Sequence, residues 1–242
     1  MAGKATALLA GSRGWHVGVN YLHSAASAEE TVASIQASGG KAIALQGDMS
    51  QEQDVLRVFD GMEEAFGPLH GVIVNAGVTA PIMQLADMSA ERLRSVFDIN
   101  VFGAYLCARE AARRLPAAKA TTSGPKAEDR SIVFVSSAAA RLGSPNEYVD
   151  YAGSKGAIDT LTVGLSKELG PKGVRVNGVR PGIIRTDIHG LAGDPGRVER
   201  LGGAAPLGRA GEAEEVAEAI VWLASPQASY TTGSIIDVAG GR

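Results

Sequence analysis

The sequence predicts an α/β fold with one parallel, doubly wound sheet and helices on both of its faces. Short apolar runs such as GVIV and IVFV alternate along the chain with longer segments whose apolar residues recur at helical spacing. Unbroken apolar runs are typical of strands that are covered on both faces. The segments between these runs are long enough for right-handed crossovers, which make successive strands parallel.

The apolar runs and the periodic segments set the expected order of elements. We expect strands over His16–Tyr21, Lys41–Gln46, Leu69–Val74, Ser131–Ser136, Val174–Val179 and Ser234–Val238. Helices are expected over Ala28–Ala37, Gln51–Phe66, Ala90–Leu115, Tyr151–Leu169 and Glu212–Ala224. The segment 117–130 combines small, polar and charged residues with Gly and Pro, which favours an exposed loop.

Length and composition limit the possible classes of protein. The 242 residues suit one α/β domain over 1–242, and a net charge of −3 does not favour a nucleic-acid surface. The only cysteine, Cys107, has no partner for an internal disulfide, and the sequence contains neither a signal peptide nor a membrane span. We therefore expect a cytoplasmic protein. The four histidines lack the spacing of metal ligands, so no metal site is expected.

Polar and turn-forming residues follow four of the predicted strands. They are Asp48, the segment 75–77 (Asn-Ala-Gly), the pair Ser136 and Ser137, and the pair Pro181 and Gly182. Ligands of a doubly wound sheet bind beyond the carboxyl ends of its strands, so these residues are candidates for a binding site. Each of them alone is more typical of a turn, a cap or a strand exit than of a binding site.

A tyrosine and a lysine lie four residues apart in YAGSK, at the start of a predicted helix. This spacing places Tyr151 and Lys155 on one helical face. A phenol ionises near pH ~10, and a neighbouring ammonium about 4 Å away could lower the phenol's pKa by roughly 3 units. Tyr151 could then act as a general acid or base. Tyr148 is a rival phenol, but the residue four positions beyond it is Ala152.

The motifs taken together resemble those of the short-chain dehydrogenase/reductase family over almost the whole chain. They are NAG (75–77), DINVFG (98–103), VSS (135–137), YAGSK (151–155), RPGIIRT (180–186) and TGSIIDVAGG (232–241). The resemblance is strongest to 3-oxoacyl-carrier-protein-reductase-like and sugar-dehydrogenase-like members. It implies a Rossmann-like single domain and an NAD(P)-dependent exchange of a hydride between a nicotinamide and a ketone or secondary alcohol.

The resemblance also implies a role for each matching residue. Tyr151 would be the general acid and base, and Lys155 would lower its pKa and bind the nicotinamide ribose. Ser137 would hold the substrate oxygen, and Asn100 would support a water molecule of the proton relay. The implied cofactor contacts are Asp48 and Met49 near the adenine, Asn75, Ala76 and Gly77 along the cleft, Tyr151 and Lys155 themselves, and Pro181, Gly182, Ile184 and Thr186 near the nicotinamide.

The opening stretch departs from the family pattern. Family members begin with a strand and a glycine-rich loop, T-G-x-x-x-G-x-G, that binds the pyrophosphate. Here the segment GKATALLAGSRG matches the helix after that loop, which makes Gly3 the last glycine of the loop. We therefore expect that the sequence lacks the first strand, which would lie between the strands ending at Tyr21 and Val74, and most of the phosphate loop. That absence would weaken dinucleotide binding.

The end of the His16–Tyr21 strand bears on the choice of cofactor. An acidic side chain there favours NAD, whereas neutral or basic donors suit the 2′-phosphate of NADP. Between Val17 and Ser27 the sequence has no acid, and Asn20, Tyr21, His23 and Ser24 could surround a phosphate or merely form a polar turn. We expect NADP, with NAD as the alternative.

Three further expectations concern the substrate, the assembly and the class of function. The Gly- and Pro-rich segment 188–212 is typical of a mobile substrate lid and names no substrate beyond a small carbonyl or alcohol. Long apolar helices, together with the resemblance, favour a homodimer or homotetramer without nucleic-acid or membrane partners. A non-catalytic nucleotide-binding or scaffold protein that keeps the fold is the alternative function.

Overall fold

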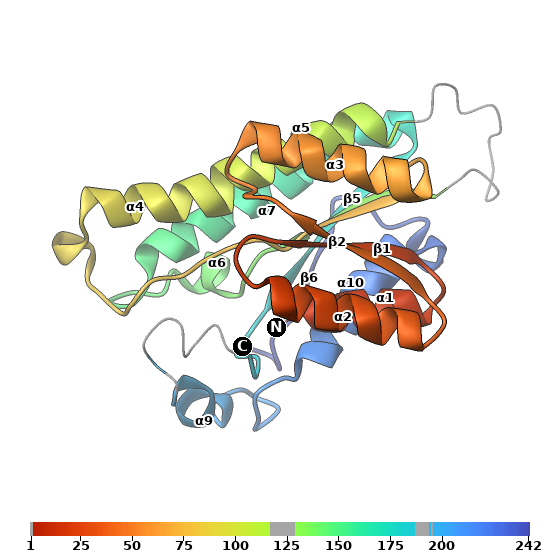
Figure 1. Ribbon diagram of the computed structural model, residues 1–242. Helices are drawn as coiled ribbons and strands as arrows, with labels where there is room; N and C mark the ends of the chain where they lie inside the picture. Colours follow the sequence, from red (N-terminus) through yellow and green to blue (C-terminus); the bar gives the residue numbers. More distant parts are fainter. Residues whose placement is uncertain (1, 117–128, 187–193, 195) are drawn as a thin grey trace.

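The computed structural model describes residues 2–116, 129–186, 194 and 196–242 (Figure 1). Most of the predicted loop 117–130 and residues 188–193 and 195 of the predicted lid lie outside the described residues. No helix among the described residues is both long and apolar enough to cross a membrane.

The strands form two parallel groups. In the first group, β1 (His16–Tyr21) pairs with β2 (Lys41–Gln46) over the full length of both strands. The second group has the order β3 (Gly71–Val74), β4 (Arg130–Val135), β5 (Val174–Pro181) and β6 (Ile235–Val238). Every one of these strand pairings is parallel, which confirms the predicted fold class. Among the described residues, no strand pairing joins the two groups.

Helices cover both faces of the sheet (Figure 1). On one face lie α3 (Glu52–Phe66), α5 (Ala104–Arg114) and α7 (Val149–Leu169). On the other lie α1 (Ala2–Ser12), α2 (Ala25–Ala37) and α10 (Ala213–Ala224). The chain also forms α4 (Ala90–Phe97), α6 (Ala139–Leu142) and α9 (Arg197–Gly202), with 3-10 turns at Leu85–Asp87, Gly170–Lys172 and Pro226–Ala228.

Strand β4 shows why unbroken apolar runs predicted this architecture. Its residues Ile132 and Phe134 belong to the core beneath α3, α5 and α7, whereas Val133 and Val135 belong to the core beneath α10. Successive side chains of a strand point to opposite faces, so both faces of β4 require apolar residues. Ile132, Val133 and Phe134 are completely buried.

The predicted helix Ala90–Leu115 is not one regular helix. A π-helical turn, Asp98–Gly103, separates α4 from α5. Single π turns are rare and often occur at functional sites. At the end of the turn, a Cβ atom on Gly103 would lie 2.8 Å from the carbonyl oxygen of Met49, so this close approach requires glycine. The periodicity of the sequence predicts the helical segment but does not detect the extra residue in the turn.

Candidate active site

The candidate catalytic residues come from a strand end and from the first two turns of a helix. Ser137 follows β4, and Tyr151 and Lys155 lie on α7. The Ser137 side chain hydrogen-bonds the phenol of Tyr151. The Lys155 ammonium lies 5.7 Å from the centre of the Tyr151 ring and donates to the carbonyl oxygen of Val135 at 2.8 Å. The fold therefore brings the three residues together, as the sequence predicted.

Burial changes the proton affinity of both titratable groups. It raises the pKa of Tyr151 above its usual value, and the Ser137 hydrogen bond opposes this rise only in part. Burial lowers the pKa of Lys155 from 10.5 to about 8, while the charge of Asp159 acts in the opposite direction. The net pKa of Tyr151 is therefore raised in the chain alone, because desolvation of the phenolate is the largest effect, and a lowering of this pKa by Lys155 stays a prediction.

Asn100 joins the loop after β3 to helix α7. The side-chain Oδ1 of Asn100 accepts from the amide of Val78 at 2.7 Å. Its Nδ2 donates to the carbonyl of Val78 at 2.8 Å and to Oγ of Ser154 at 3.0 Å. Both amide hydrogens are thus used within the protein. Neither Val78 nor Ser154 was predicted from the sequence, because they lie 22 and 54 positions away from Asn100 and no local pattern links them.

Gly77 lies where these groups meet. A Cβ atom at this position would be 3.2 Å from both the Lys155 ammonium and Oδ1 of Asn100. Ala76, Asn100 and Lys155 also line one small buried hollow. The predicted NAG segment therefore runs directly beside the candidate catalytic residues.

The start of α1 approaches the same loop. A Cβ atom on Gly3 would lie 2.8 Å from Nδ2 of Asn75, so glycine permits this contact between α1 and the end of β3. The unpaired amides of a helix N-terminus attract phosphate groups. The position of Gly3 beside the exposed Asn75 therefore fits the pyrophosphate region of a dinucleotide cofactor.

The predicted residues at the ends of β1 and β2 differ in what their side chains do. Asn20 uses its Nδ2 atom to donate to the carbonyls of Leu45 and Gly47, both at 3.1 Å, and so joins β1 to the end of β2. His23 and Ser24 are exposed just before α2, and Tyr21 is half-buried. The donors of Asn20 thus serve the fold, whereas His23 and Ser24 face solvent.

Asp48 and Met49 follow β2 and stabilise the turn that leads to α3. Oδ1 of Asp48 accepts from the amide of Ser50 at 2.9 Å and from its hydroxyl at 2.7 Å. Met49 is buried, and its carbonyl lies against Gly103 in the π turn. In this structure the side chain of Asp48 stabilises a turn. A contact of Asp48 with the adenine stays a prediction.

The segment after β5 lies against the other strand ends. Pro181 accepts a backbone hydrogen bond from Ala138 at 2.9 Å, which joins it to the Ser137 loop. Gly182 donates to Val238 at 3.0 Å, and a Cβ atom on Gly182 would lie 2.7 Å from Cα of Ala239. Ile184 is buried and pairs with Gly211, and Thr186 is half-buried. Within the described part of the chain, no cluster of metal-ligating side chains is present.

Comparisons with known proteins identify the family. The family model described as enoyl-(acyl carrier protein) reductase matches residues 2–242. The chain belongs to the short-chain dehydrogenase/reductase family. It is 48% identical over 240 residues to the uncharacterized oxidoreductase YgfF of Escherichia coli (strain K12), covering 99% of this chain and 95% of that protein.

Two further matches agree with this membership. The chain is 34% identical over 241 residues to the L-rhamnose 1-dehydrogenase (NAD(P)(+)) of Sphingomonas sp. (strain SKA58), covering 99% of this chain and 91% of that enzyme. A crystal structure of a short-chain type dehydrogenase/reductase from Mycobacterium marinum superposes with a TM-score of 0.88 at 31% identity, covering 99% of this chain and 90% of that one. The predicted family and fold are thus confirmed.

Proposed function

We propose that this short-chain dehydrogenase/reductase is an NAD(P)-dependent enzyme that interconverts a ketone and a secondary alcohol. The observation that carries the proposal is the cluster of Ser137, Tyr151 and Lys155 beside Gly77 and Asn100. When bound, a nicotinamide cofactor would supply or accept the hydride. The glycines at positions 3 and 77 let the backbone approach Asn75 and Lys155 closely, which places the start of α1 and the NAG segment at one site where such a group could bind.

In carbonyl reduction, Tyr151 acts as the general acid. Its raised pKa keeps the phenol protonated near neutral pH. The phenol O–H donates its proton to the substrate oxygen as the carbonyl carbon becomes tetrahedral, and the Ser137 hydroxyl holds that oxygen in place. The Tyr151 phenolate that remains is stabilised by the Lys155 ammonium. In alcohol oxidation the same phenolate accepts the proton.

We infer that a water molecule that relays protons to Lys155 contacts the backbone of Asn100. The side-chain amide of Asn100 is not its partner. Both amide hydrogens already bind Val78 and Ser154. Asn100 lies within the π-helical turn Asp98–Gly103, and single π turns often occur at functional sites. Asn100 therefore supports the site in two ways, through its side chain and through its place in the turn.

NADP is the proposed cofactor, with NAD as the alternative. The exposed residues His23 and Ser24 follow β1 without an acidic neighbour between Val17 and Ser27. A histidine and a hydroxyl can donate to a 2′-phosphate, whereas a carboxylate would repel it. The relative from Sphingomonas is named as an enzyme that uses NAD or NADP.

A homodimer or homotetramer is the proposed assembly. Phe97, Phe102 and Tyr105 are large apolar residues that are exposed along α4, the π turn and α5. Exposed large apolar side chains of this kind favour contact with a second copy of the chain. The substrate is proposed only as a small carbonyl or alcohol compound.

The test of the proposed function is the oxidation of NADPH, followed at 340 nm, with a panel of ketones, β-keto esters and aldoses. We expect Tyr151→Phe to lower turnover at least ~100-fold, the scale of a lost general acid. Tyr148→Phe is the matched control and should keep turnover within about threefold of the unmodified chain. Full turnover by Tyr151→Phe would overturn the proposal, and binding of NADPH without turnover of any panel member would favour the non-catalytic alternative.

A further inference from the structure

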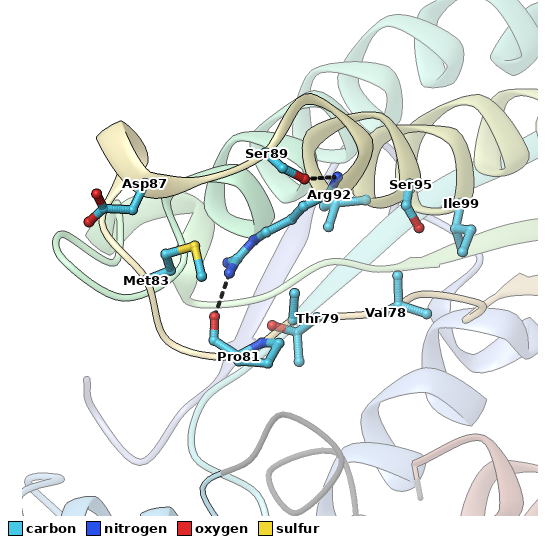
Figure 2. A pocket seen from close by; sticks show the side chains of 11 residues that line it. Val78, Thr79, Pro81, Met83, Asp87, Ser89, Arg92, Ser95 and Ile99 are labelled. Carbon is cyan, nitrogen blue, oxygen red and sulfur yellow. Dashed lines mark hydrogen bonds between the residues drawn. The ribbon is translucent and has the colours of Figure 1, made fainter.

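Arg92 connects three segments that surround the candidate active site. It belongs to α4, and its Nη1 atom donates to the carbonyl of Pro81, in the loop that continues from the NAG segment, at 2.6 Å. Its Nε atom donates to Oδ2 of Asp150 on α7 at 2.9 Å. Figure 2 shows the side chain of Arg92 reaching from α4 to Pro81 along an open pocket of about 440 Å³.

Asp150 acts directly on the backbone of Tyr151. Its Oδ1 atom accepts from the amide of Tyr151 at 2.9 Å. The first amides of a helix have no partner within the helix, and the N-cap residue Tyr148 offers no side-chain acceptor to them. Asp150 therefore fixes the first turn of α7 at the residue whose phenol is the proposed acid.

The two side chains depend on each other because both are buried. The side chain of Asp150 is 1% exposed and that of Arg92 is 11% exposed. A buried carboxylate is stable only when it is paired and hydrogen-bonded. Arg92 provides that charge, and its fork geometry makes the contact directional, with Nη2 lying 3.4 Å from Oδ1.

We propose that Arg92 and Asp150 are positioning residues that hold the phenol of Tyr151 in its reactive place against the loop after β3. The inference rests on the proposed function, in which this phenol transfers the proton. Neither residue touches the reacting atoms in this role. Their effect passes through the Tyr151 backbone and through the carbonyl of Pro81.

The variants for the test are Arg92→Gln, Asp150→Ala and Asp150→Asn. We expect Arg92→Gln and Asp150→Ala to lower kcat about tenfold or more, because a displacement of about 1 Å can cost on the order of 100-fold. The KM for NADPH should stay within about threefold, since the cofactor contacts are not altered. Asp150→Asn should recover at least about threefold of the kcat lost in Asp150→Ala, because its carbonyl can still accept from the Tyr151 amide.

A second readout does not require turnover. Phenol ionisation is followed by absorbance as the pH is raised. Subtracting the titration of Tyr151→Phe from that of the unmodified chain isolates the Tyr151 phenol. Subtracting the titration of the double variant Arg92→Gln/Tyr151→Phe from that of Arg92→Gln isolates the same phenol in the variant. The midpoint depends on burial and on the Ser137 hydrogen bond, so a displaced phenol should titrate at least ~0.5 pH unit away from the original midpoint. Arg109→Gln is the matched control, because Arg109 pairs with Glu52 on the surface and should change neither readout.

The outcomes separate the inference from the proposed function. If Tyr151→Phe abolishes turnover while the three variants keep their kcat and the phenol keeps its midpoint, Arg92 and Asp150 do not position Tyr151 and the proposed function stands. If the unmodified chain turns over no substrate, the proposed function fails. The titration still tests the inference in that case, because an unchanged midpoint of the Tyr151 phenol in Arg92→Gln would overturn it. If Arg92→Gln does not fold, the kcat values of Asp150→Ala and Asp150→Asn test the inference instead, and equal kcat values in these two variants would overturn it.

Discussion

Replacing Lys155 by methionine should change how the stability of the protein depends on pH. Lys155 is buried, and burial lowers its pKa from 10.5 to about 8. At about 1.36 kcal/mol per pKa unit, this depression corresponds to about 3 kcal/mol of cost for keeping the ammonium charged in the folded chain. The uncharged methionine side chain of the variant would carry no such cost at any pH.

The direction of the effect follows from proton binding. Below pH 8 the lysine is charged in both the folded and the unfolded chain, so the full cost is present. Between pH 8 and pH 10.5 the unfolded chain binds a proton that the folded chain does not, so the free energy of unfolding rises with pH. The unmodified protein should therefore gain about 3 kcal/mol relative to Lys155→Met over this range.

The assay is urea unfolding of both proteins at several pH values from 7 to 10.5, without cofactor. Taking the difference between the two proteins removes the titration of all other groups that both share. The lost hydrogen bond to Val135 shifts the variant's stability by a constant amount and leaves the pH dependence interpretable. Lys167→Met, at an exposed lysine on the same helix, is the control and should show a flat difference. A flat difference for Lys155→Met as well would refute the reasoning, since the ammonium would then not be desolvated.

Four further predictions address the cofactor region, the core and the assembly. Gly3→Ala should lower the affinity for NADPH about tenfold in calorimetry, because its Cβ atom would displace the Asn75 amide, and an unchanged affinity would contradict this contact. Calorimetry should also give tighter binding of NADPH than of NADH, with His23→Asp narrowing or reversing the gap; equal affinities in the unmodified chain would argue for a simple polar turn. Ile132→Ala, at a completely buried position of β4, should lower the free energy of unfolding by about 2–5 kcal/mol in urea, and a loss under about 1 kcal/mol would be inconsistent with a close-packed core. Light scattering at micromolar concentration should give about two or four times 24.9 kDa, and a monomer mass would exclude the proposed assembly.

The sequence alone predicted the architecture and the catalytic candidates, because both depend on local patterns. The run IVFV predicted a strand buried on both faces, and Val133 and Phe134 lie in the two separate cores on either side of β4. The spacing of Tyr151 and Lys155 placed them on one face of a helix, and they lie together there. Such patterns repeat with the period of a strand or a helix, so residues that are close together in the sequence are enough to predict these elements.

Tertiary structure decided the features that depend on residues far apart in the chain. Arg92 and Asp150 are 58 positions apart, and no periodicity links them. Asn100 lies in a π turn and donates to Ser154, which is 54 positions away on α7. The pKa of Tyr151 is raised rather than lowered because burial outweighs the Ser137 hydrogen bond, and burial is a property of the assembled fold. A sequence motif identifies the groups that meet, but their protonation depends on desolvation and on contacts between distant residues. Desolvation and such contacts arise only when the helices pack against the sheet.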